Sequence, residues 1–154
     1  MKSLALVVAV LSLFAAMPAS AQTATDELET ARTQIQADRK AIVSRLMDMT
    51  ETESAAFWPI YNEYREEIRK VDDQLVDLSE SYFKGADSLT DKQAQEMLSD
   101  WIKLRGDRLA VKKGYVKKFS KAIPTTKLIR YYQIENKMDA VVDYELAAAI
   151  PLVE

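Results

Sequence analysis

Three charged residues interrupt the apolar faces of the expected helices and are the first candidates for chemistry. Arg108, Glu135 and Glu145 each fall where a hydrophobic residue would continue the pattern. Paired carboxylates could serve as the acid and base of a glycosidase, but regular helices offer no signature of a pocket around them. The same residues could form buried ion pairs or line an exposed groove. We therefore expect no enzymatic activity.

The side chains that most metal sites use are missing from the sequence. It contains no cysteine and no histidine, the usual ligands of zinc, and histidine is also the usual acid-base group near neutral pH. Methionine can bind Cu(I), but Met47, Met49, Met97 and Met138 are scattered singly, as core-filling methionines are. The sequence predicts no catalytic residue, no metal and no cofactor.

The N-terminus has the layout of a secretory signal. Met1 and Lys2 are followed by an apolar stretch over residues 4–16 and by small residues up to Ala21. The stretch is shorter than the roughly 20 residues of a membrane-spanning helix. We expect cleavage of residues 1–21 after Ala21, which leaves residues 22–154 as one helical domain without a transmembrane anchor.

The charge balance is mildly acidic. The chain has 21 basic and 24 acidic residues, and removal of Lys2 with the signal leaves a net charge of −4. This balance disfavours nucleic acid as a partner. The charges are unevenly distributed, because residues 22–83 are predominantly acidic and residues 84–123 predominantly basic.

Apolar residues recur at steps of three and four along the chain, and no segment alternates with the period of a strand. This pattern predicts an all-α fold of four amphipathic helices over residues 25–47, 51–83, 91–121 and 126–149. The two middle helices would each be about 45–50 Å long, against about 35 Å for the outer two. Short connections make neighbouring helices antiparallel, so we expect a long central hairpin with shorter outer helices.

The tip of this hairpin, around Gly85, would extend beyond the outer helices. Two helices alone cannot bury the apolar residues there, and a contiguous exposed set implies a partner. We therefore expect an elongated homodimer with a seam of Leu75, Leu78, Tyr82, Met97, Leu98 and Trp101.

Aromatic and basic residues near the other end of the hairpin are candidates for a surface that binds client proteins or other partners. Its members are Tyr61, Tyr64, Arg105, Arg108, Lys112 and Tyr115. Two plainer interpretations remain open. The tyrosines could be ordinary core, and the basic residues could pair with Glu63, Glu66 and Glu67 of the preceding helix.

Two helix starts share the pattern of a capping box. Thr50 precedes Glu53 by three residues, and Thr90 precedes Gln93 in the same way. In such a box the threonine side chain accepts a hydrogen bond from the backbone amide of the third helical residue. The side chain of that residue in turn accepts a hydrogen bond from the threonine backbone amide. Apolar residues, Met49 and Leu89, stand before the threonines.

The segment Leu89-Thr90-Asp91-Lys92-Gln93 resembles the LTxxQ motif of the Spy/CpxP family of periplasmic chaperones and envelope-stress proteins. Residues 49–53 resemble a degenerate first copy that lacks the leucine and the glutamine. The resemblance implies a thin, cradle-shaped dimer that holds non-native proteins without ATP. Some relatives bind metals and some restrain a sensor kinase.

On this basis we expect a periplasmic, ATP-independent, chaperone-like protein whose amphipathic surface binds partly unfolded envelope proteins. Two alternatives remain. The protein could be an accessory or inhibitor that docks on the periplasmic domain of an envelope-stress or metal-responsive sensor, or a structural helical protein with one fixed partner.

Overall fold

The computed structural model describes residues 37–85 and 88–149, which form helices and no strands. The all-α prediction is therefore confirmed for the described chain. The chain divides into two compact units, Met1–Leu46 and Met47–Glu154. The predicted signal peptide and the beginning of the first predicted helix lie outside the described residues. Its remainder is helical over residues 37–47, and at Asp48 the backbone is left-handed with a φ of 48°, a conformation in which helices commonly end.

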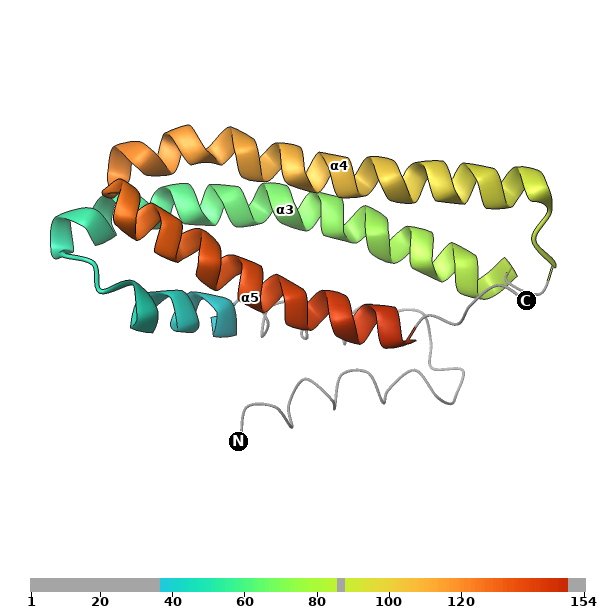
Figure 1. The fold of residues 1–154 in the computed structure, drawn as a ribbon, viewed down its shortest axis with the longest axis horizontal. Helices are drawn as coiled ribbons and strands as arrows, with labels where there is room; N and C mark the ends of the chain where they lie inside the picture. The colour runs from blue at the N-terminus through green and yellow to red at the C-terminus, as the bar shows by residue number, and fades with distance from the viewer. Residues whose placement is uncertain (1–36, 86–87, 150–154) are drawn as a thin grey trace. The chain divides into compact units, whose positions relative to one another are not determined.

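The second unit contains three helices, α3 (Glu51–Gly85), α4 (Asp91–Ala122) and α5 (Thr125–Ala149). Helices α3 and α4 run antiparallel as a long hairpin, and α5 turns back along it (Figure 1). These bounds lie within two residues of the predicted ones, and α3 continues through Lys84 and Gly85 instead of ending at Phe83. Among the described residues, no helix is long and apolar enough to cross a membrane.

Local hydrogen bonds explain where α3 and α4 begin. The Thr50 amide donates to Glu53 Oε2 at 2.8 Å, and the Glu53 amide donates to Thr50 Oγ1 at 3.2 Å. The same reciprocal pair joins Thr90 and Gln93 at 3.0 and 3.4 Å. Each box satisfies two backbone donors that a helix start leaves without an intrahelical partner. Both LTxxQ-like segments are thus helix starts.

The turn between α4 and α5 follows from one proline. Ile123 is extended, and its amide donates to the Phe119 carbonyl at 3.1 Å. Pro124 comes next, and a residue before proline is disfavoured in the helical region. Helix α5 can begin immediately because proline needs no amide partner there, and its carbonyl accepts from Leu128 at 2.9 Å.

The core of the second unit is a cluster of aromatic rings at the end of the hairpin where α5 begins. Phe57 of α3, Phe119 of α4 and Tyr131 of α5 are fully buried. Their ring centroids lie 4.8–5.2 Å apart, distances at which aromatic pairs attract beyond their buried area. One ring from each helix therefore joins all three elements.

Burial decreases along the hairpin toward its tip. The last buried residue of α3 is Val71 and the first of α4 is Leu104; none of the described side chains between them is buried. Helix α5 changes similarly, since Val141 in its second half is about half exposed. The end of the hairpin near Gly85 is therefore only partly covered in this unit.

Candidate functional site

The structure corrects half of the predicted client surface. Tyr61, Tyr64 and Tyr115 are buried in the aromatic core of the second unit, and Tyr64 lies edge-on to Tyr115 with centroids 5.4 Å apart. Their spacing follows the seam of the helices, and a seam residue covered by a third helix becomes core. These three side chains are therefore not a surface for a partner.

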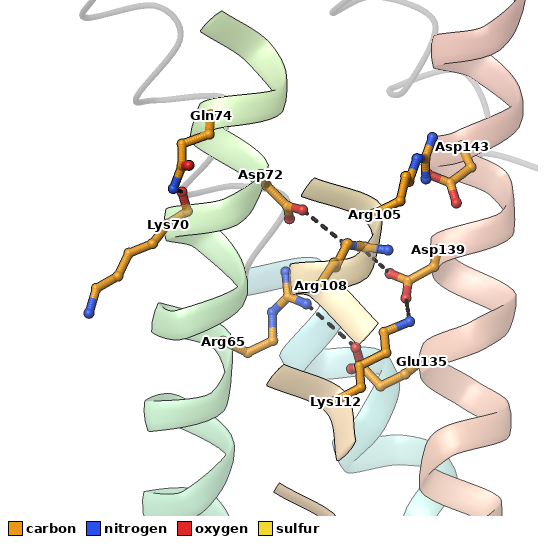
Figure 2. Close-up of polar contacts among 10 residues, drawn as sticks. All are labelled: Arg65, Lys70, Asp72, Gln74, Arg105, Arg108, Lys112, Glu135, Asp139 and Asp143. Carbon is orange, nitrogen blue, oxygen red and sulfur yellow. Dashed lines mark hydrogen bonds and ion pairs between the residues drawn. The ribbon is translucent and has the colours of Figure 1, made fainter. Parts of the chain in front are cut away.

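The basic members of the same predicted surface belong to an ion-pair network between the three helices (Figure 2). Arg108 of α4 donates through Nε to Asp72 of α3 and through Nη2 to Asp139 of α5, each at 3.0 Å. Lys112 Nζ donates to the other oxygen of Asp139 at 2.7 Å. Arg105 donates to Asp143 at 3.0 Å. Arg108 is thus a largely buried ion-pair residue, with its side chain 11% exposed, which is close to one of the two roles left open for it.

A second pair lies deeper in the same interface. Arg65 of α3 faces Glu135 of α5 at 3.5 Å, and the Glu135 side chain is 1% exposed. Buried charges are tolerated in proteins when they are paired and hydrogen-bonded. Glu135 was one of the three charged residues on an apolar face, and it too forms a buried ion pair. The side chain of Glu145, the third, lies outside the described part of the chain.

The network shifts the pKa values of Asp72 and Arg108. Burial raises the pKa of Asp72, and the nearby guanidinium groups of Arg108 and Arg65 offset this only in part. Burial alone would lower the pKa of Arg108, but Asp72 and Asp139 outweigh it and raise the pKa above its ordinary value. Arg108 therefore stays charged between its two carboxylates.

Of the three glutamates expected to pair with basic residues of the following helix, only Glu63 does so among the described residues, whereas Glu66 and Glu67 pair with Arg69 and Lys70 of α3 itself. Lys118 donates to Glu63 at 2.6 Å, and its ammonium group lies 4.3 Å from the centroid of the Tyr115 ring. Contact with Lys118 lowers the pKa of Glu63, and Tyr115 contributes in the same direction. Charge complementarity between the two halves of the hairpin thus accounts for this lysine.

The outer side of α4 carries a line of exposed apolar residues, of which only Leu98 belongs to the predicted dimer seam. Ile102, Leu109 and Val116 recur every seven residues, and Leu98 lies one turn before Ile102. All four side chains are between 43% and 58% exposed. We call these four residues the α4 outer row. Its seven-residue spacing, which Leu104 and Val111 on the inner side of α4 share, was the signal in the sequence.

Lysines flank the α4 outer row. Lys113, Lys117 and Lys121 follow one another at steps of four and are all exposed, so they lie on adjacent turns of one side of the helix. No ion pair of theirs occurs among the described residues. Contiguous exposed apolar side chains with a polar rim are typical of binding surfaces, so the α4 outer row is the candidate site.

The predicted dimer seam is partly exposed. Leu98 and Trp101 are about half exposed, whereas Leu75, Leu78, Tyr82 and Met97 are intermediate. The Arg105 guanidinium lies 5.4 Å from the centroid of the Trp101 ring, a cation–π distance. Pairing of two chains through this seam remains a prediction.

Comparison with protein-family models, with curated proteins and with solved structures yields no match. Over the described residues, no group of three or more acidic, histidine or cysteine side chains is arranged to hold a metal ion.

Proposed function

We propose that this protein is a periplasmic, ATP-independent, chaperone-like protein that binds partly unfolded envelope proteins on the α4 outer row. The observation that carries the proposal is the exposure of four large apolar side chains along one line of a single helix. Unfolded segments expose apolar side chains that a folded protein buries. The row therefore favours unfolded segments as binding partners. The location in the periplasm rests on the predicted signal peptide.

The size of the row is consistent with weak, reversible binding. Complete burial of one such side chain contributes roughly 1.5–3 kcal/mol, and about half of each is already covered. The four together would contribute on the order of 3–6 kcal/mol, and the entropic cost of association opposes this gain. A client would therefore dissociate readily, as ATP-independent release requires.

An aggregation assay tests the proposal. Light scattering of two unrelated unfolding proteins would be followed with and without residues 22–154. We expect suppression of both, and we expect Ile102→Asp with Leu109→Asp to abolish it, because the two charges interrupt the row. Ala110→Asp is the matched control, since Ala110 is exposed on α4 outside the row. Failure to protect either protein, or full protection by the double variant, would contradict the proposal.

The lysines beside the row favour a second candidate, an accessory that docks on one acidic partner such as the periplasmic domain of a sensor. Lys113, Lys117 and Lys121 would pair with acidic groups next to the apolar contact. Promiscuity separates the two functions. A chaperone acts on several unrelated proteins, whereas an accessory or a structural protein acts on one partner.

We also propose homodimerisation through the hairpin tip. Leu78 and Trp101 are incompletely buried in the single chain, and pairing about a two-fold axis would cover both. Leu98 belongs to this seam as well as to the α4 outer row, so a dimer would leave Ile102, Leu109 and Val116 of the row to a client. Sedimentation of residues 22–154 tests this proposal, and we expect Leu78→Asp with Trp101→Asp to dissociate the dimer. A monomer at tens of micromolar protein would refute it.

A further inference from the structure

The two halves of α5 are held to the hairpin by different chemistry. In the first half, Leu128, Tyr131 and Ile134 are buried, and Tyr131 sits among the rings of the aromatic core. In the second half, Asp139 alone is buried among the described side chains of residues 136–148. Among the described residues, full burial of apolar side chains therefore ends at Ile134, Met138 and Val142 are only partly buried, and carboxylates supply the polar contacts from there.

Those carboxylates form a regular series. Glu135, Asp139 and Asp143 follow at steps of four, so they lie on one side of α5. Each faces a basic residue of the hairpin (Figure 2). Glu135 pairs with Arg65, Asp139 pairs with Arg108 and Lys112, and Asp143 pairs with Arg105. We call these contacts the ionic clamp.

The clamp ends where burial of the hairpin ends. Leu104, the first buried residue of α4, precedes Arg105, and Val71, the last buried residue of α3, precedes Asp72. Arg105 pairs with Asp143, and Asp72 shares Arg108 with Asp139. The second half of α5 therefore lies at the level of Leu104 and Val71, and beyond it the hairpin is only partly covered.

We propose that residues 138–149 of α5 are a strap, held by the ionic clamp, that opens about the Glu135 region while residues 125–134 stay seated in the aromatic core. Opening uncovers Leu104 and Val71, and it extends the apolar surface of the hairpin tip by one further level. Ion pairs suit such a device because the hydration of the separated charges offsets the lost attraction, whereas separating an apolar contact exposes apolar surface to water at a cost in free energy. The strap goes beyond the proposed chaperone function and does not depend on it.

Hydrogen–deuterium exchange of backbone amides tests the strap. Asp143→Asn removes a half-exposed pair, so we expect exchange in residues 138–149 to rise about two- to fivefold. Asp139→Asn removes the partner of both Arg108 and Lys112, so we expect a rise of about tenfold or more in the same residues. Exchange in residues 125–134 should stay at the level of the unaltered protein in Asp143→Asn.

Two further variants complete the test. Asp107→Asn is the matched control, because Asp107 pairs with Lys103 within α4, and it should leave exchange of α5 unchanged. Arg105→Asp combined with Asp143→Arg restores an ion pair in reverse and should restore slow exchange. The strap is refuted if Asp143→Asn raises exchange equally in both halves of α5 or in neither, or if the reversed pair gives no recovery.

Discussion

Two buried tyrosine hydroxyls should cost this protein stability. Tyr64 is 1% exposed and Tyr131 is fully buried, and neither hydroxyl has a hydrogen-bond partner among the described residues. Tyr132, next to Tyr131 on α5, differs because its hydroxyl donates to the Lys112 carbonyl at 2.8 Å. Replacement by phenylalanine removes the hydroxyl and keeps the ring, so the three positions separate these cases.

The expected signs are opposite. A buried polar group without a partner costs about 1–3 kcal/mol, whereas a made hydrogen bond contributes about 0.5–1.5 kcal/mol. The small void left by the oxygen offsets part of the first gain. We therefore expect Tyr64→Phe and Tyr131→Phe each to raise the free energy of unfolding by about 1 kcal/mol, and Tyr132→Phe to lower it by about 1 kcal/mol.

Urea unfolding followed by circular dichroism measures these differences, provided that the slope with denaturant is the same in all variants. Tyr132→Phe is the matched control, since it has the same chemical change on the same helix. If Tyr64→Phe and Tyr131→Phe destabilise the protein as much as Tyr132→Phe does, the two hydroxyls are hydrogen-bonded in solution and do not cost the protein stability.

Four other outcomes are expected. Thr90→Ala should lower the free energy of unfolding by about 0.5–2 kcal/mol through loss of the α4 cap; unchanged stability with weaker client binding would instead give the motif a binding role. Phe119→Ala should cost about 3–5 kcal/mol in urea unfolding, because Phe119 is fully buried among aromatic rings; a loss below about 1 kcal/mol would contradict its place in the core. Burial raises the pKa of Tyr132 from 10.0 to about 12, so between these values the unfolded chain loses a proton that the folded chain keeps, and the free energy of unfolding should fall as pH rises; a fall of equal steepness in Tyr132→Phe would contradict this. Calorimetric titration of residues 22–154 with Zn²⁺ or Ni²⁺ should reveal no stoichiometric micromolar site, since histidine and cysteine are absent.

The local pattern of residues was enough to predict the helices. Thr50 and Thr90 mark two helix starts because capping needs only residues three apart. Pro124 disfavours a helical conformation at the residue before it, and this separates α4 from α5. The effect is local, so the sequence alone predicts it. The apolar residues at steps of three and four also predicted the helical faces, because helical periodicity is local. The predicted bounds of α3, α4 and α5 agree with the observed ones within two residues.

The roles of the residues on those faces depended on tertiary structure. Tyr64 and Leu109 both lie on regular apolar lines, yet Tyr64 is core and Leu109 is about half exposed, because within the described part of the chain only the line of Tyr64 packs against other helices. Likewise, the sequence left Arg108 open between a buried ion pair and an exposed surface, and only the structure shows that it pairs with Asp72 and Asp139, 36 and 31 positions away in sequence. Sequence periodicity sets which side chains share a face of a helix, but the packing of α5 against the hairpin decides which face is buried and which charges meet.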